Sequence, residues 1–151
     1  MADILDFSHY EIKLVNGSDE GIVVITKPLW SVSIYKIPRI RYTICRSLLT
    51  YKDFMPLSYS GVYFLIGTQA GHNTIYIGQA GERSSNQSIL ARIAEHDRSS
   101  DKDFFKDLIF ITNSAHDFGP TEVDFLEQRF WQLATECRNY IVHNLSSRVN
   151  V

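Results

Sequence analysis

The sequence predicts an α+β protein in which helices flank a small antiparallel sheet of three strands, preceded by a strand-rich N-terminal extension. Three observations lead to this fold class. Short strand-like segments fill the first part of the chain, a hairpin pattern opens the second part, and two helical segments then alternate with one apolar strand. We therefore expect a β-rich extension over residues 1–58 and a domain over residues 59–151. A chain of 151 residues is long enough to bury its own core.

The extension is expected to begin with three short strands. Residues 10–15 and 31–35 alternate apolar and polar side chains, which is typical of half-buried strands. Residues 22–25 form a β-branched run, and a proline soon after it ends the strand because proline cannot donate to a ladder. Residues 41–49 then have the pattern of a short helix.

The second part begins with a predicted hairpin. Residues 61–66 and 74–78 are its two strands, and the segment from Gly67 to Asn73 supplies the turn. A helix is predicted over residues 89–98, and residues 108–112 are apolar enough to form a buried central strand.

The clearest predicted helix begins near Pro120. Its apolar side chains step by three and four along one stripe: Val123, Leu126, Phe130, Leu133 and Cys137. Thr121 and Asp124 have the spacing of a capping box. Glu127 lies about 80° from the centre of the stripe, at the edge of the expected buried face, where a carboxylate can point into a cleft. An ordinary place on the helix rim would also explain it.

Composition limits the classes of function. There are 15 basic and 17 acidic residues, a net charge of −2, which argues against a protein held on nucleic acid by charge alone. No apolar run reaches the roughly 18 residues that a membrane span needs. The first ten residues lack the basic start of a signal peptide, so we expect a cytoplasmic protein in which Cys45 and Cys137 are reduced.

Two pairs of side chains could carry chemistry. If the apolar residues of both hairpin strands face one core, Tyr63 and Tyr76 share the opposite face. Arg92 and His96 are four apart on the next helix and share one side of it. Cross-strand aromatic packing would also account for the tyrosines, and a solvated helix face for Arg92 and His96.

Together these residues resemble the GIY-YIG nuclease family. The similarity covers residues 60–144 and depends on the order and approximate spacing of these positions: Gly61-Val62-Tyr63, Tyr76-Ile77-Gly78, Arg92 with His96, Glu127 and Asn144. Two departures exist, valine in place of the isoleucine in the first motif and a slightly longer gap between the motifs. Neither removes a chemical group. The extension, from Gly21 to Arg39, is similar to that of one subgroup.

The resemblance implies hydrolysis of phosphodiester bonds in nucleic acid, with DNA as the expected substrate and one divalent metal ion, Mg²⁺ or alternatively Mn²⁺. Glu127 would hold the metal, since one carboxylate with waters and phosphate suffices for Mg²⁺. Tyr63 would act as general base or orient water, which needs a positive charge nearby because a free phenol has a pKa near 10. Arg92 would donate to phosphate oxygens.

The remaining motif residues have supporting roles in this interpretation. Tyr76 would position water or phosphate, His96 would relay a proton or bind phosphate, and Asn144 would tie the C-terminal segment to the site. A second interpretation stays open, in which the same scaffold is inactive and serves as a nucleic-acid-binding or protein-binding module.

Substrate affinity is expected from a local basic cluster. Four cations are interleaved with aromatic residues such as Trp30 and Tyr42, a pattern that suits a phosphate backbone: Lys36, Arg39, Arg41 and Arg46. An ordinary solvated face over core aromatics explains the same residues. A targeting domain or a partner protein outside this chain could add the affinity that a net charge of −2 does not provide.

Overall fold

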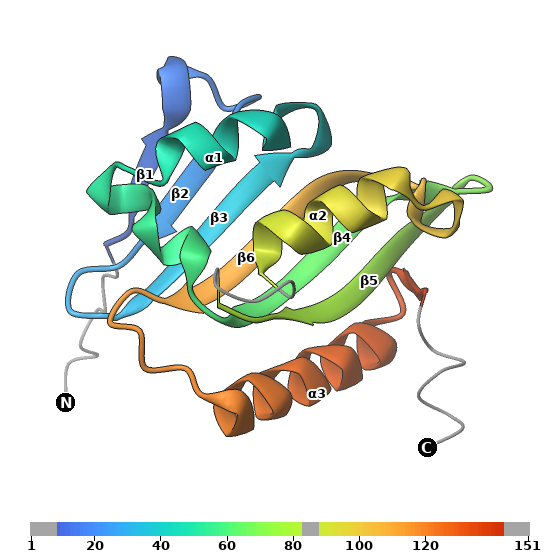
Figure 1. The fold of residues 1–151 in the computed structure, drawn as a ribbon. Helices are drawn as coiled ribbons and strands as arrows, with labels where there is room; N and C mark the ends of the chain where they lie inside the picture. Colours follow the sequence, from blue (N-terminus) through green and yellow to red (C-terminus); the bar gives the residue numbers. More distant parts are fainter. Residues whose placement is uncertain (1–8, 83–87, 144–151) are drawn as a thin grey trace, which may run out of the picture.

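A computed structural model describes residues 9–82 and 88–143. Seven strands form one mixed sheet in the order β1-β2-β3-β6-β4-β5-β7 (Figure 1). Their bounds are β1 Glu11–Leu14, β2 Val23–Thr26, β3 Val32–Pro38, β4 Gly61–Gln69, β5 His72–Ala80, β6 Phe105–Asn113 and β7 Ile141–Val142. The α+β class is confirmed, but the prediction of a small three-stranded sheet is wrong.

The size of the sheet comes from one pairing that the sequence does not reveal. β3 runs antiparallel to β6 along its whole length, from Val32 opposite Asn113 to Pro38 opposite Asp107. This contact joins the β1-β2-β3 meander to the β6-β4-β5 part, so both predicted parts share one sheet. Alternation of side chains indicates a strand but not its partner, because the pairing depends on residues some seventy positions away. The division of the chain at residue 58 stays a prediction.

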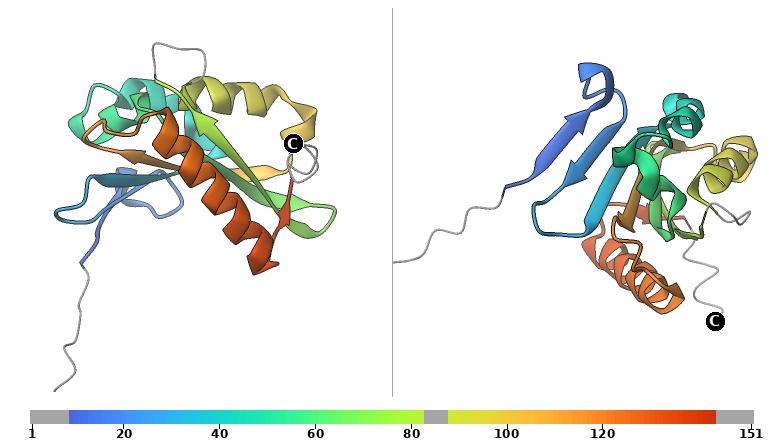
Figure 2. Two further views of the ribbon diagram at one scale, coloured as in Figure 1. Left: turned by 90° about the horizontal axis from the view of Figure 1, so that it is seen from below. Right: turned by 60° about the vertical axis from the view of Figure 1, so that its left-hand side comes forward.

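Helices lie on both faces of this sheet (Figures 1 and 2). One face carries α2 (Ile89–Arg98) and a chain of short turns, namely η2 (Arg39–Ile44), α1 (Cys45–Leu48) and η3 (Lys52–Ser58). The predicted helix over 41–49 is thus split into a 3-10 segment and one α turn. Two further 3-10 turns are η1 (Val15–Gly17) and η4 (Ser100–Lys102).

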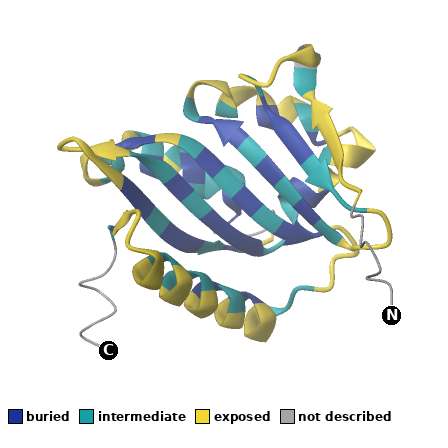
Figure 3. Ribbon diagram, turned by 180° about the vertical axis from the view of Figure 1, so that it is seen from behind, coloured by how far each residue is buried: buried dark blue, intermediate teal, exposed yellow. Residues whose placement is uncertain are grey.

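The opposite face carries α3 (Pro120–Cys137), which packs on the β4–β5 half. Figure 3 shows this face, with α3 offset from the β2-β3-β6 part of the sheet. The two faces have separate cores. Tyr35, Leu65 and Phe110 belong to the core on the α2 side, whereas Val62 and Ile77 pack against α3.

The rotation of α3 differs from its sequence pattern. Its buried residues are Val123 and Glu127, while Leu133 is 41% exposed and Cys137 is exposed. The helix has therefore turned toward Glu127 relative to the centre of its apolar stripe. The predicted capping box is also wrong, because the cap is Gly119, whose N–H donates to Oε2 of Glu122 at 3.1 Å.

The β4–β5 hairpin is longer and tighter than predicted. Both strands continue to Gln69 and His72, so only Ala70 and Gly71 form the turn. Both have a positive φ, 52° and 78°, which is the type I′ geometry that matches the twist of the strands. Within the described part of the chain, the structure holds no helix long and apolar enough to cross a membrane.

Candidate active site

The hairpin brings the two motif tyrosines onto one face of the sheet. Tyr63 lies opposite Gly78 and Tyr76 lies opposite Leu65, so both rings point toward α2. Their centroids are 6.1 Å apart. The residues that alternate with them, such as Val62 and Ile77, pack on the α3 side. The predicted register of the two tyrosines is confirmed.

Gly78 is required by the position of the Tyr63 ring. A Cβ atom at residue 78 would lie 2.6 Å from both Cζ and the hydroxyl oxygen of Tyr63. Carbon atoms in contact are normally about 3.5–4.0 Å apart, so no side chain fits there without moving the ring. The last glycine of the second motif therefore has a packing reason that is specific to the tyrosine of the first.

A buried hydrogen bond links Tyr63 to α2. Its hydroxyl oxygen lies 2.7 Å from Nε2 of His96, and the two residues are 1% and 6% exposed. Ile89 and Ile93 anchor the same side of α2 in the core, which directs His96 one turn further at the tyrosines. The His96 ring also lies 5.2 Å from the Tyr76 ring. His96 thus contacts both tyrosines.

Burial keeps this hydrogen-bonded pair neutral. It raises the pKa of Tyr63 well above its ordinary value, with Tyr76 adding to the effect and Arg92 opposing it. Burial, together with the charge of Lys102, lowers the pKa of His96 to about 4. At neutral pH a phenol therefore donates to the lone pair of a neutral imidazole. The remaining ring proton of His96 is consequently on Nδ1.

Arg92 lies one helical turn before His96, at the mouth of a pocket. Its guanidinium approaches Glu95 at 3.6 Å, and its side chain is partly buried. The pocket has a volume of about 440 Å³ and lies where the end of β5 meets the beginnings of α2 and α3. Arg92 lines it from α2, Gln79 from β5 and Val123 from α3. Residues from the helices on both faces of the sheet therefore line this pocket.

Glu127 lies on α3, on the face of the sheet opposite to α2. It is 9% exposed and lies one turn beyond Val123, on the side of α3 that faces β5. The same side carries Asp124, which accepts a hydrogen bond from Gln79. Glu127 thus shares neither helix nor sheet face with Tyr63. Neither residue lines the pocket of Arg92, although nearby helix residues do, namely Val123 from α3 and Arg92 from α2.

A metal ion bound near Glu127 would have few ligands from the described residues. Among residues 9–82 and 88–143, no group of three His, Cys, Asp or Glu side chains could hold a metal ion. A buried carboxylate at Glu127 nevertheless matches Mg²⁺, which takes one or two carboxylates and completes its octahedron with water and phosphate. Glu82 is the carboxylate that lines the pocket of Arg92, whereas Glu127 lies outside that lining. Asn144, the last motif residue, lies outside the described residues.

Three neighbours of the tyrosines were missed by sequence reasoning. The Nζ atom of Lys102 lies 4.8 Å from the Tyr76 ring centroid and 2.7 Å from Oδ2 of Asp101. Nε2 of His143 lies 3.3 Å from the same oxygen, and its ring contacts Tyr76 at 6.3 Å. Asp101 and Lys102 belong to η4 and His143 follows β7, and only the folded chain brings them together. No spacing pattern signals them.

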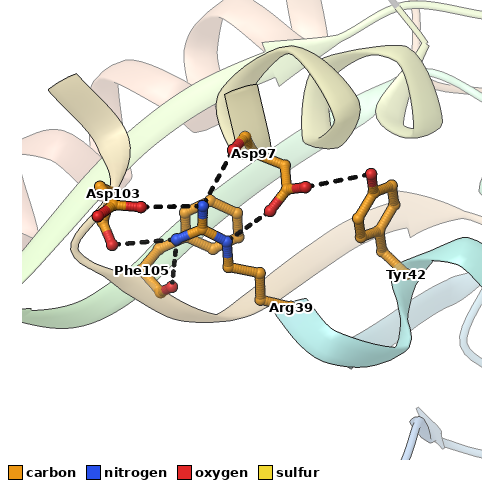
Figure 4. A network of polar contacts seen from close by, with 5 residues as sticks. All are labelled: Arg39, Tyr42, Asp97, Asp103 and Phe105. Carbon is orange, nitrogen blue, oxygen red and sulfur yellow. Dashed lines mark hydrogen bonds and ion pairs between the residues drawn. The ribbon is translucent and has the colours of Figure 1, made fainter. Parts of the chain in front are cut away.

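The basic cluster predicted for nucleic-acid binding is divided by the fold. Arg39 donates five hydrogen bonds, to Oδ1 of Asp97 at 2.6 Å, Oδ1 of Asp103 at 3.2 Å and three carbonyl oxygens of Asp97, Asp103 and Phe105 (Figure 4). A guanidinium has five N–H groups, so these bonds use its whole donor capacity. Arg39 therefore holds η2 against α2 and β6, and its N–H groups are already used within the fold.

The other three cations do not form one surface. Lys36 lies opposite Ile109 of β6, which lies opposite Phe64, so it belongs to the sheet face that α3 covers. Arg41 and Arg46 are exposed on η2 and α1, on the other face. Binding by these residues stays a prediction, but a single phosphate backbone would contact only one of the two groups.

No protein-family model, curated protein or solved structure was found to match this chain.

Proposed function

We propose that the protein is a metal-dependent endonuclease that hydrolyses phosphodiester bonds in nucleic acid, with DNA as its substrate. The observation that carries this proposal is the buried hydrogen bond between Tyr63 and His96, beside Tyr76 and one turn from Arg92. The resemblance to GIY-YIG nucleases assigns chemistry to the same four residues from spacing alone. Their proximity in the fold supports that assignment.

His96 is the terminal proton acceptor in this proposal. Attack of water on a phosphate releases a proton, and Tyr63 can accept it only as its own proton passes to Nε2 of His96. The imidazole is neutral at pH 7, because its pKa is about 4, so its lone pair is available. Tyr76 is half-buried beside both rings and connects them to the surface. Both tyrosines thus orient the water, and His96 stores the proton.

A cation near Tyr63 would favour its phenolate form, although Arg92 lowers the pKa of His96 as well. The pKa of Tyr63 is too high and that of His96 too low for proton transfer between them at rest. Arg92 already opposes the rise in the pKa of Tyr63, and it would donate to phosphate oxygens as negative charge develops. A magnesium ion held by Glu127 would polarise the scissile phosphate and stabilise the leaving oxygen.

The burial of Tyr63 favours one alternative. A phenol that is 1% exposed is not in direct contact with solvent, which would also suit a non-catalytic scaffold that binds nucleic acid or a protein. In that case the Tyr63–His96 hydrogen bond would only stabilise the fold. The two functions differ in metal-dependent turnover, and a cytoplasmic location is compatible with both.

Cleavage of supercoiled plasmid and of branched DNA tests the proposal. We expect cutting that requires Mg²⁺ or Mn²⁺ and falls by at least about a hundredfold in Glu127→Gln, since loss of a metal ligand removes the charge stabilisation. Glu136→Gln is the matched control, because it changes an exposed carboxylate on the same helix. Tyr63→Phe should reduce cleavage, while Tyr51→Phe, at a tyrosine that is 63% exposed, should not.

Two outcomes would contradict the proposal. Wild-type protein that binds DNA but shows no metal-dependent cleavage of either substrate would favour the binding module. Glu127→Gln protein that cleaves as fast as Glu136→Gln would show that Glu127 does not hold the metal. The circular dichroism spectrum of each variant, compared with that of the wild type, separates a lost function from a lost fold.

A further inference from the structure

A second, larger groove lies on the α2 side of the sheet, away from the tyrosine cluster. Its volume is about 590 Å³, and it lies between strands β1 to β3 and the η3 turn. Val24 and Tyr35 form its floor, on the same sheet face as Tyr63. Neither the proposed catalytic residues nor the predicted basic cluster lines it. The proposed cleavage mechanism therefore does not use this groove.

The walls of the groove combine cations with flat aromatic rings. Lys13, Lys27 and Lys52 line it against two acids, Glu11 and Asp53. Lys13 forms an ion pair with Asp53 at 2.9 Å. The groove therefore has a local excess of positive charge, although the whole chain carries −2.

Trp30 presents the most exposed ring of this groove. The indole is 56% exposed, although burying a tryptophan is strongly favourable. The Nζ atom of Lys27 lies 4.1 Å from the centroid of that ring. Because this cation lies over one face of the indole, a base would stack on the other face while Lys27 contacts a phosphate.

Consecutive residues connect the groove to the candidate active site. Tyr59 lines the groove, and the next residue, Ser60, lines the pocket of Arg92. The ring of Tyr59 stacks on His116 at 4.2 Å with an interplanar angle of 13°. Nε2 of His116 in turn lies 2.9 Å from Oε1 of Glu82, which also lines that pocket. A bound strand could thus pass over the Tyr59–His116 pair from one site to the other.

We propose that this groove binds an unpaired segment of the nucleic-acid strand that leads to the scissile phosphate. Bases in a duplex are stacked on one another, so only an unpaired base can stack on Trp30. The lysines would contact the phosphates of the same segment. This inference rests on the proposed nuclease function and specifies its substrate class, namely branched or flapped DNA with a single-stranded arm.

Fluorescence anisotropy without added metal tests the groove separately from cleavage. The probes are a short labelled oligothymidylate and a blunt duplex of matched length at one salt concentration. We expect Trp30→Ala to weaken binding of the oligothymidylate by about tenfold and that of the duplex by less than twofold. Trp30→Phe keeps an aromatic ring and should retain most of the wild-type affinity for the oligothymidylate. Phe125→Ala is the matched control, since Phe125 is an aromatic residue on α3 that is 68% exposed.

Three results would overturn the inference: no binding of the oligothymidylate by wild type, equal losses for both probes in Trp30→Ala, or the same loss in Phe125→Ala. Because no metal is present, these results do not depend on cleavage. If Trp30→Ala weakens binding of the oligothymidylate alone but Glu127→Gln does not affect cleavage, the groove inference is supported and the assignment of Glu127 in the proposed nuclease is wrong. If Glu127 is essential but Trp30→Ala binds normally, the groove inference alone fails.

Discussion

Gly78→Ala is expected to destabilise the protein through one identified contact. The new methyl group would lie 2.6 Å from Cζ and from the hydroxyl oxygen of Tyr63. The ring is 1% exposed, and the hydroxyl group is held by His96 at 2.7 Å, so it cannot move aside freely. Overpacking costs about 1–3 kcal/mol, and a weakened buried hydrogen bond adds about 1 kcal/mol. We expect a loss of about 3 kcal/mol, or roughly 6–12 °C in Tm.

A double-mutant cycle isolates the contact. Tyr63→Leu removes the ring atoms that the methyl group would meet, so Gly78→Ala should cost less than about 1 kcal/mol in that background. The coupling energy between the two positions would then be about 2 kcal/mol. Urea unfolding followed by circular dichroism measures all four free energies, with the slope of each transition as a check on the compactness of the unfolded state.

The result that would refute this reasoning is additivity. If Gly78→Ala costs the same in the wild type and in Tyr63→Leu, its effect comes from the strand itself and not from the tyrosine. The two motifs would then not be coupled through packing, and the close fit of Tyr63 over Gly78 would no longer account for the glycine.

The other predictions concern acid stability and thiol reactivity. The pKa of His96 is about 4 in the folded state and near 6.5 when unfolded, so the unfolded state binds more protons between these values. Stability should therefore fall as the pH drops from 6.5, by a total of about 3 kcal/mol below pH 4, and His96→Gln should flatten this part of the profile in urea titrations. Of the two thiols, Cys137 is exposed and Cys45 is buried with its pKa raised to about 12, so Ellman's reagent should modify one thiol in the native protein and both in urea. Rapid reaction of both thiols in native protein, or of neither, would contradict this arrangement.

Local features of the fold could be predicted from the sequence. The alternation in residues 61–66 and 74–78 was enough to place Tyr63 and Tyr76 on one face, because a slip of one residue would expose a whole apolar set. The helix over Ile89–Arg98 was predicted with its bounds, since it has helical periodicity and a serine at its N-terminus. These successes depend on interactions between residues close in the chain.

Features that depend on distant residues could not be predicted. The β3–β6 pairing joins segments that share no local signal, and it turns a small sheet into one of seven strands. The fold divides the predicted basic cluster for a similar reason. Arg39 contacts Asp97 and Asp103 only in the folded chain, because they are far from it in the sequence. Successive side chains of β3 alternate between the two faces of the sheet, so Lys36 lies on the face opposite to that of η2 and α1.

The orientation of α3 in the structure differs from the one that its apolar periodicity predicts. Periodicity would bury Leu133 and Cys137, yet the helix turns so that Glu127 is 9% exposed and Leu133 is 41% exposed. Exchanging a leucine for a carboxylate in the interface with the sheet costs free energy, because a buried charge needs compensation that an apolar side chain does not. The apolar residues that pack on the sheet in place of Leu133 and Cys137 are Leu126, Phe130, Trp131 and Ala134, which step by three and four together with Val123. Glu127 lies near the centre of the face that these residues define, so their packing accounts for its burial.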